Sequence, residues 1–249
     1  MDAIEQFGVG SGASRLVTGN HPLFRELETR LATLKGTEDA VVFGSGFLTN
    51  SGVIPALMGA SDAIFLDELS HACIYYGSRL SDAATHVFRH NDLEHLNELL
   101  EAYRGACTHA MIVTDGVFSM DGDLAPVGAL VDLAQQFDAW LMTDDAHGIG
   151  VVGGGHGSSF ENGKRHGVAL QMGTLSKAIG GYGGYLCASQ TVIDLIRTRC
   201  RTFIYSTGLP PASVAAAIAA LDLIENDPEF AARPVTLAKR FTRALNLPN

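Results

Sequence analysis

Short apolar runs alternate with amphipathic segments along most of the chain, and this alternation restricts the possible folds more than any other feature. Short apolar runs bounded by turn residues predict strands, and apolar residues spaced three and four apart predict helices. The expected strands cover residues 40–43, 63–66, 85–88, 110–114, 140–143, 169–172 and 185–188. The expected helices cover 22–35, 46–58, 71–81, 92–103, 126–138, 190–201 and 211–226. Strands that alternate with helices predict an α/β fold with three layers, αβα, around a mostly parallel central sheet.

Composition narrows the class of protein and of partner. The chain has 249 residues and a formal net charge of −10, which fits one large domain or two small ones and argues against nucleic acid or an anionic membrane as the main partner. The longest weakly polar stretch, 212–224, is too short to span a bilayer, and from the first residues given we expect no secretory signal. The four cysteines form no CxxC pair, so we expect reduced thiols in a cytoplasmic protein.

Several common motifs are incomplete or missing. Residues 8–13 approximate GxGxxG/A, but no strand precedes them and no helix opens on them, so a dinucleotide fold is not expected. The Gly-Lys pair at 163–164 is followed by arginine instead of the P-loop serine or threonine, and neither HExxH nor GxSxG occurs. His90 and His95 lie at the polar start of a helix, where we expect solvated histidines and no metal site. A second group is expected to form a solvated basic stripe: Arg197, Arg199 and Arg201.

The most unusual residues follow expected strands. The acidic pair 144–145 and His147 come after the strand 140–143, and Lys177 follows the strand 169–172. In parallel sheets, ligands bind at the carboxyl ends of the strands. Taken alone, the acidic pair and its histidine fit a helix cap or half of a metal site as well as a catalytic group. A lysine between small residues at this edge is expected to be partly desolvated, which would lower the pKa of its amine and make it a nucleophile.

Pyridoxal phosphate chemistry requires such a lysine. It also requires an acid opposite the pyridine nitrogen, a phosphate cradle and a flat group against the ring. Asp144 is placed for the first role, the helix N-terminus at 44–47 offers backbone N–H groups for the second, and His71 suits the third. Each has an ordinary alternative, since 44–47 can be a glycine turn and a histidine at a helix start is usually structural.

Six segments together resemble the α-oxoamine synthase family of pyridoxal phosphate enzymes, which have fold type I and are similar to class II aminotransferases. The segments are 44–47, 66–72, 115–123, 144–148, 174–177 and 205–207, and they follow the family's order over nearly all of the chain. The resemblance implies the large domain of fold type I transferases, pyridoxal 5′-phosphate as the cofactor and a homodimer with a shared active site. It also implies a remnant of an N-terminal segment at 1–20, the cofactor-binding domain at 21–226, and at 227–249 the start of a connection to a small C-terminal domain that is expected to be missing.

The resemblance also implies roles for individual residues. Lys177 would bind the cofactor covalently and move the α-proton, Asp144 would pair with the pyridine nitrogen, and His147 would hydrogen-bond the phenolic oxygen, with Ser119 nearby. His71 would stack on the ring and approach the substrate. The implied phosphate contacts are Gly46, Phe47 and Thr174 of one subunit with Ser206 and Thr207 of its neighbour. The expected catalytic residues are therefore Lys177, His71, Asp144 and His147.

Members of this family condense an amino acid with an acyl thioester and release carbon dioxide. The expected substrates here are L-alanine and either pimeloyl-CoA or a pimeloyl carrier protein. Gly46 favours them over glycine and acetyl-CoA, because the enzymes that use that pair usually have cysteine at this position. The alternatives are that second reaction, another reaction of the family, or a shortened domain that binds the cofactor or forms dimers without turnover.

Overall fold

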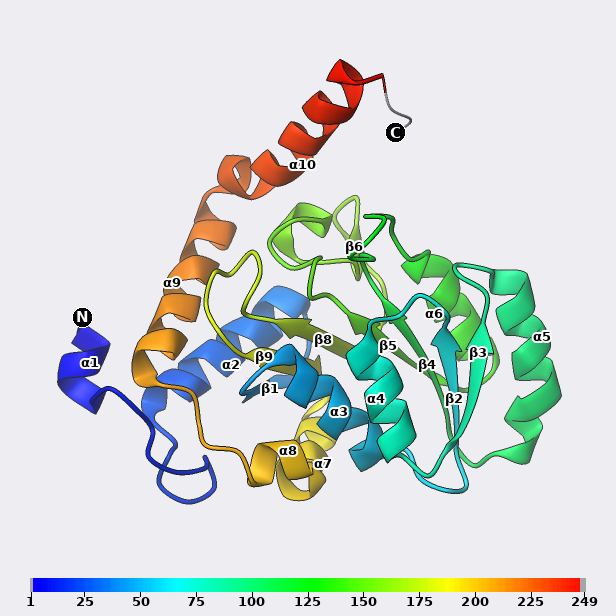
Figure 1. Ribbon diagram of the computed structural model, residues 1–249, viewed down its shortest axis with the longest axis horizontal. Helices are drawn as coiled ribbons and strands as arrows, with labels where there is room; N and C mark the ends of the chain where they lie inside the picture. Colours follow the sequence, from blue (N-terminus) through cyan, green and yellow to red (C-terminus); the bar gives the residue numbers. More distant parts are fainter. Residues whose placement is uncertain (1, 247–249) are drawn as a thin grey trace.

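A seven-stranded sheet forms the centre of the structure, a computed structural model that describes residues 2–246 (Figure 1). Its strands are β1 (Asp39–Phe43), β2 (Ala63–Asp67), β3 (Ala84–Phe88), β4 (Ala110–Asp115), β5 (Trp140–Asp144), β8 (Leu170–Thr174) and β9 (Gly184–Ala188). Their order in the sheet is β1-β9-β8-β5-β4-β2-β3. β9 runs antiparallel to both of its neighbours, and the other strands all run in one direction. The predicted mostly parallel sheet is therefore confirmed.

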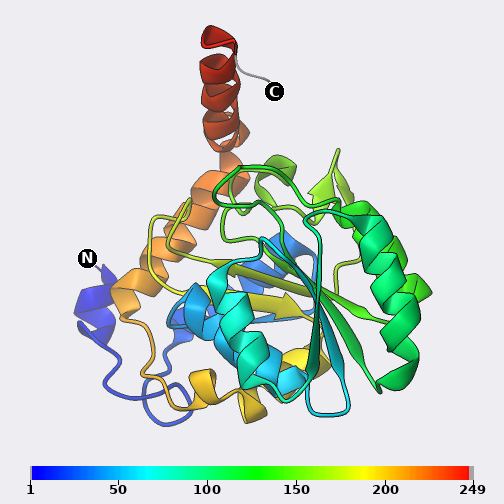
Figure 2. The same ribbon diagram turned by 45° about the vertical axis from the view of Figure 1, so that its right-hand side comes forward.

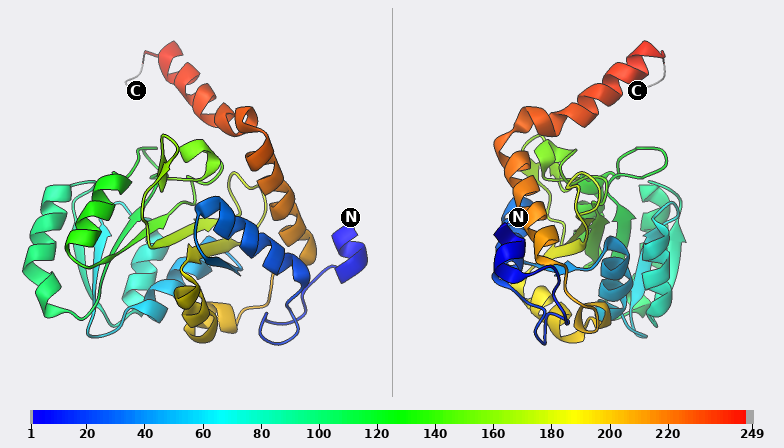
Figure 3. Two further views of the ribbon diagram at one scale, coloured as in Figure 1. Left: turned by 180° about the vertical axis from the view of Figure 1, so that it is seen from behind. Right: turned by 60° about the vertical axis from the view of Figure 1, so that its left-hand side comes forward.

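Helices cover both faces of the sheet and complete the three predicted layers. One face carries α3 (Gly46–Leu57), α4 (Ala72–Leu80), α7 (Gln190–Arg199) and α8 (Arg201–Ile204) (Figure 2). The opposite face carries α2 (Pro22–Lys35), α9 (Pro211–Asn226), α5 (Leu93–Tyr103) and α6 (Val127–Gln136) (Figure 3). Neighbouring residues of β2 show this division, since Ile64 packs on the first face and Phe65 on the second. Because both faces are buried, the strands are apolar along their length instead of alternating with polar residues.

The sequence pattern does not predict every element. α1 (Asp2–Phe7), α10 (Pro228–Ala244) and the hairpin of β6 (Phe160–Glu161) with β7 (Lys164–Arg165) are additional, and α10 projects away from the sheet (Figure 1). Asn162 and Gly163 form the hairpin turn with φ of 49° and 75°, and Asn-Gly is the usual sequence signal for such a turn. The single predicted helix at 190–201 is wrong, because the extended backbone of Cys200 separates α7 from α8.

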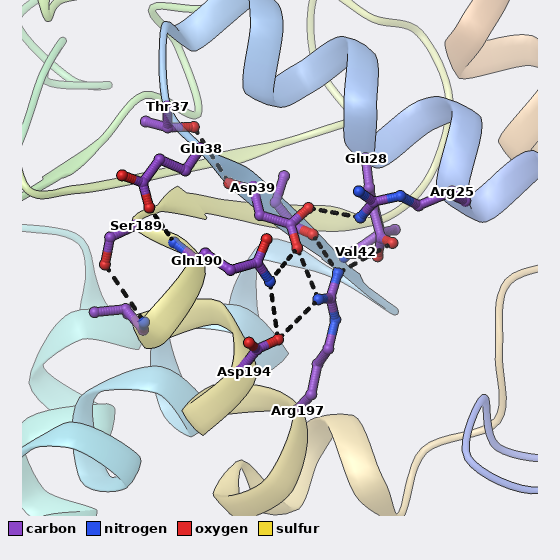
Figure 4. Close-up of polar contacts among 12 residues, drawn as sticks. Arg25, Glu28, Thr37, Glu38, Asp39, Val42, Ser189, Gln190, Asp194 and Arg197 are labelled. Carbon is purple, nitrogen blue, oxygen red and sulfur yellow. Dashed lines mark hydrogen bonds and ion pairs between the residues drawn. The ribbon is translucent and has the colours of Figure 1, made fainter.

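A network of ion pairs joins α2, β1 and α7 (Figure 4). Arg197 donates to Asp39 Oδ2 at 2.7 Å, and Arg25 donates to Asp39 Oδ1 at 2.8 Å. Arg197 also lies 3.6 Å from the buried Glu28, which pairs in addition with Arg15 of the N-terminal segment. The expectation of a solvated stripe is therefore wrong for Arg197, because two buried carboxylates beneath it require a cation.

A second ion pair lies entirely inside the protein and anchors the loop that follows β5. Lys35 Nζ, at the end of α2, donates to Asp145 Oδ2 at 2.6 Å and to the His156 carbonyl at 2.6 Å. Both charged side chains are 0% exposed. The other oxygen of Asp145 accepts from the Ser158 N–H at 2.9 Å. The pair thus fixes the chain directly after Asp144 against α2.

Two findings bear on the class of protein. All four cysteines, which lie within the described range, are free thiols as predicted, and three of them are buried. No helix within residues 2–246 combines the length and the apolar character needed to cross a membrane.

Replacing Lys35 by methionine should lower the free energy of unfolding by about 3–5 kcal/mol, because Asp145 would remain buried without its cation. Urea denaturation followed by circular dichroism measures the loss. Arg30→Met is the matched control, since Arg30 pairs with the partly exposed Asp222 and Glu225 and such pairs contribute about 1 kcal/mol or less. Equal losses in the two variants would show that the buried pair stabilises the fold no more than the exposed pairs do.

Candidate active site

The carboxyl edge of the sheet collects buried oxygen-bearing side chains. β2 ends in Asp67, β4 in Asp115, β5 in Asp144 and β8 in Thr174, and each of these residues is buried. Parallel strands that end at one edge bring these residues together, whereas they are far apart in the sequence. This edge therefore brings together several buried side chains that can bind a polar ligand.

Asp144 is a buried carboxylate with hydrogen-bond donors but no cation beside it. Its Oδ2 accepts from Asn50 Nδ2 at 2.7 Å, and its Oδ1 accepts from the Ala146 N–H at 2.9 Å. No lysine or arginine of the described residues forms an ion pair with it. Burial raises the pKa of Asp144, and the two hydrogen bonds oppose that shift. A cation placed beside this carboxylate would therefore be strongly favoured.

His71 is held by its own helix so that one ring nitrogen faces the protein. It is the N-cap of α4, and its Nδ1 accepts from the Cys73 N–H at 3.2 Å and lies 2.8 Å from Cys73 Sγ. Burial raises the pKa of Cys73 to about 12, so the thiol keeps its proton. Because Nδ1 is an acceptor, the neutral ring carries its proton on Nε2. The His71 residue is otherwise exposed and presents its ring at the surface.

His147 and Lys177 lie close enough to affect one another electrostatically. Burial lowers the pKa of His147, the positive charge of Lys177 lowers it further, and the charge of Asp144 opposes both. The structure thus brings together three of the predicted catalytic residues. His71 belongs to the same group, since its charge also acts on His147 and on Asp144.

The predicted desolvation of Lys177 is wrong, because its side chain is exposed. Lys177 lies in the loop between β8 and β9. Within this loop Leu175 donates to the Gly183 carbonyl at 3.0 Å, and Gly181 donates to the Leu175 carbonyl at 2.8 Å. These bonds close a tight loop at the edge of the sheet and direct its tip, with Lys177, toward solvent.

The start of α3 provides free backbone donors beside Thr174. Ser45 caps this helix by accepting from the Leu48 N–H at 3.1 Å, whereas the N–H groups of Gly46 and Phe47 have no acceptor within the helix. A Cβ added to Gly46 would lie 3.4 Å from Thr174 Cβ, so these two residues are in close contact. The N-terminus of a helix attracts anions. Gly46, Phe47 and Thr174 therefore form a cradle of suitable polarity for a phosphate.

The remaining predicted residues lie on loops, where Ser119 and Thr207 are exposed and Ser206 is half-buried. Ser119 is exposed in the loop after β4, and Ser206 and Thr207 lie between α8 and α9. The backbone of Thr207 forms an isolated antiparallel β-bridge with Ser14 of the N-terminal segment. No hydrogen bond among residues 2–246 links Ser206 or Thr207 to Asp144, so this single chain does not bring them into the group.

Two residues of this edge, Asn50 and Asp115, were not predicted from the sequence to belong to the site. Asn50 donates to Asp144, and Asp115 accepts from the His71 N–H at 3.1 Å. Asn50 is a polar residue on the buried face of an apolar helix, and Asp115 ends its strand as Asp144 does. These two signals were present in the sequence and would have identified them.

His90 holds the loop that carries Ser119, so the expectation of a solvated histidine is wrong for this residue. Its Nδ1 lies 3.1 Å from Asp67 Oδ1, and its Nε2 lies 2.7 Å from Asp123 Oδ2. Burial alone would lower the pKa of His90, but the hydrogen bonds and charges of Asp67 and Asp123 outweigh burial and raise it. The protonated ring therefore bridges β2 to the Ser119 loop.

Because the pKa of His90 is raised, this bridge is complete at low pH and is lost as the pH rises through that pKa. In wild type, hydrogen-exchange protection of residues 117–124 should therefore fall as the pH rises from 6 to 8. In His90→Gln, protection at pH 6 should be about tenfold lower, equivalent to ~1.4 kcal/mol, which is near the lower end for a charged hydrogen bond. His109→Gln is the control, since His109 precedes β4 at the opposite edge of the sheet. Protection that is independent of pH in wild type would contradict the bridge.

Comparisons with known proteins show which family the chain resembles. A family model described as aminotransferase class I and II matches residues 1–247. The chain is 67% identical over 248 residues to a putative 8-amino-7-oxononanoate synthase of Acidiphilium cryptum, covering 100% of this chain and 64% of that protein. It is 62% identical to an 8-amino-7-oxononanoate synthase of Granulibacter bethesdensis, again covering 64% of the relative. The chain thus spans a little under two thirds of the length of these relatives.

Solved structures show the same fold. Serine palmitoyltransferase of Sphingomonas wittichii superimposes with a TM-score of 0.85 at 36% identity, covering 90% of this chain and 56% of that one. An 8-amino-7-oxononanoate synthase of Francisella tularensis superimposes with a TM-score of 0.76 at 27% identity, covering 91% and 63%. A serine palmitoyltransferase of S. paucimobilis superimposes with a TM-score of 0.85 at 33% identity, covering 90% of this chain and 56% of that one. That structure contains a bound aldimine of pyridoxal phosphate and myriocin.

Proposed function

The chain belongs to the aminotransferase class I and II family, and from this premise we propose that it acts as an 8-amino-7-oxononanoate synthase of biotin biosynthesis. In this reaction L-alanine condenses with pimeloyl-CoA, or with a pimeloyl carrier protein, and carbon dioxide is released. Relatives that are 58–67% identical and carry this name support the proposal. The cofactor is pyridoxal 5′-phosphate.

The observation that carries the proposal is the environment of Asp144. A buried carboxylate without a cation is costly, and it persists where a ligand supplies the positive charge. The protonated pyridine nitrogen of pyridoxal phosphate is such a cation. Asn50 and Ala146 donate to the carboxylate oxygens of Asp144 and orient the group. The residues at the centre of the site therefore fit the ring of this cofactor.

The surrounding residues fit the rest of the cofactor. Gly46 and Phe47 offer free N–H groups at a helix N-terminus, where a phosphate is stabilised, and Thr174 lies against Gly46. The exposed His71 provides a flat ring with a proton on Nε2. Lys177 provides an accessible amine beside His147. Each chemical requirement is met by a residue of this chain.

When bound, pyridoxal phosphate supplies an electron-withdrawing ring that stabilises negative charge on the α-carbon of an amino acid. Asp144 would keep the pyridine nitrogen protonated by remaining ionised next to it. Lys177 is the residue whose amine would hold the aldehyde carbon of the cofactor and, when free, would accept the proton from the α-carbon of alanine. His147 would hydrogen-bond the phenolic oxygen, and His71 would limit access to one side of the ring.

We also propose that two copies of the chain complete the site. Ser206 and Thr207 are separate from the Asp144 group within one chain, and their hydroxyl groups are suited to contact the phosphate held by a partner copy. A chain that remains monomeric in sedimentation experiments with the cofactor would contradict this arrangement.

Reduction with borohydride should attach the cofactor permanently to Lys177. After the chain is mixed with pyridoxal phosphate, reduced and digested, mass spectrometry should find the added mass on the peptide that contains Lys177. Lys177→Ala should abolish this label, whereas Lys164→Ala, which removes an exposed lysine of β7, should retain it. A label on another lysine, or none in wild type, would disprove the cofactor assignment.

Alanine with pimeloyl-CoA should release coenzyme A faster than glycine with acetyl-CoA, as measured by chromatography of the free thiol. Asp144→Asn should lower kcat by about 10²–10³, because it removes a charge that stabilises the reacting system. Faster release with glycine and acetyl-CoA would reassign the chain to glycine C-acetyltransferase activity. No release with either pair would favour a domain that binds the cofactor without turnover.

A further inference from the structure

Asp115 and Asp144 form a pair of buried carboxyl groups at the site. They end the neighbouring parallel strands β4 and β5 and lie opposite each other in register. Each residue is only 4% exposed. Burial raises the pKa of both groups, and the charge of Asp144 contributes to a pKa of about 8 for Asp115. Near neutral pH the pair therefore holds about one proton, because two adjacent buried negative charges are unfavourable.

The two carboxyl groups receive unequal numbers of hydrogen bonds. Asp144 accepts two, from Asn50 Nδ2 at 2.7 Å and from the Ala146 N–H at 2.9 Å. Asp115 accepts one, from the His71 N–H at 3.1 Å. Donors stabilise the ionised form of a carboxyl group, so the charge is favoured on Asp144 and the proton on Asp115.

The side chain of Asn50 supplies the difference between the two groups. Asn50 is 0% exposed and projects from α3. Its Nδ2 bonds to Asp144 and to Cys73 Sγ, at 3.1 Å from the sulfur, whereas its Oδ1 has no partner among the described residues. An unpaired buried oxygen is costly, and a nonpolar side chain would avoid that cost. The strong hydrogen bond that this amide makes is the one to Asp144.

The other charged groups around the pair do not reverse this preference. Asp67 of β2 adds negative charge near Asp115, which favours its protonated form. Asp145 adds negative charge near Asp144, but Lys35 neutralises it. The N–H of His71, the N-cap of α4, donates to Asp115, and the positive form of its ring would favour ionised Asp144. His147 also acts on Asp144, and its positive form would favour the same ionised group.

We propose that Asn50 is a positioning residue that directs the single proton of the carboxyl pair to Asp115 and so keeps the negative charge on Asp144. The benefit of that charge for pyridoxal phosphate rests on the proposed function. The distribution of the proton within the pair does not depend on it.

Binding of pyridoxal phosphate at pH 7.5, measured by titration of its absorbance, tests the role of Asn50. Asn50→Leu should weaken binding about tenfold, which corresponds to a shift of one pKa unit. Asp115→Asn should change binding by less than about threefold, because Asp115 already holds the proton and is neutral. The double variant should recover to within about threefold of wild type, because Asp144 then has no neighbour competing for the charge. A double variant as weak as Asn50→Leu, or Asn50→Leu equal to wild type, would overturn the proposal.

The matched control is Gln171→Leu, which removes another fully buried amide. Gln171 bonds to the Lys35 carbonyl and to Ser159, not to the carboxyl pair. Adding Asp115→Asn to this variant should not improve cofactor binding. Recovery there as large as in the Asn50 background would show a general structural effect and would overturn the proposal.

A measurement without cofactor separates this inference from the proposed function. Folded Asp115 keeps its proton up to a pH of about 8, whereas the unfolded chain loses it near a pH of about 4. The melting temperature of wild type should therefore fall, relative to that of Asp115→Asn, as the pH rises from 5 to 8. Parallel pH profiles of the two proteins would overturn the proton assignment. Wild type that binds no pyridoxal phosphate would instead contradict the proposed function.

Discussion

The buried carboxyl group of Asp144 is the constraint on which the site depends. An ionised carboxylate inside a protein is stable only with a cation or with strong hydrogen-bond donors. Its neighbour in the sequence, Asp145, is neutralised by Lys35 at 2.6 Å, whereas the donors to Asp144 within residues 2–246 are Asn50 and Ala146. Two adjacent residues of one type thus have different surroundings, because the fold supplies a cation to Asp145, whereas we propose that a ligand supplies one to Asp144.

The architecture explains how the protein tolerates this charge. The strands are buried on both faces by apolar contacts. The stability from these contacts offsets the free-energy cost of burying polar groups at the edge of the sheet. The Lys35–Asp145 pair then fixes the loop after β5, and the Arg197 network fixes β1 against α2 and α7. The site is therefore built on rigid strand ends, while Lys177 lies on a loop that reaches solvent.

Much of the fold was predictable because strands and helices differ in the period of their apolar residues. All seven strands of the sheet were expected within one or two residues of their ends. The β6–β7 hairpin was missed although Asn162-Gly163 signals its turn, and the break at Cys200 gave no such signal. The exposure of Lys177 was also predicted wrongly, since small neighbouring residues do not determine whether a long side chain points toward the protein or toward solvent.

The sequence by itself determined the layers of the fold, the family and the residue types that pyridoxal phosphate needs, because these depend on local periodicity and on short ordered motifs. Only the tertiary structure decided which residues surround Asp144. Asn50 and Asp115 lie 94 and 29 residues away from it along the chain, and they meet it only where α3, β4 and β5 converge. Hydrogen bonds and charge repulsion act through space, so the proton balance of this edge follows from the packing of the strands and not from the order of the residues.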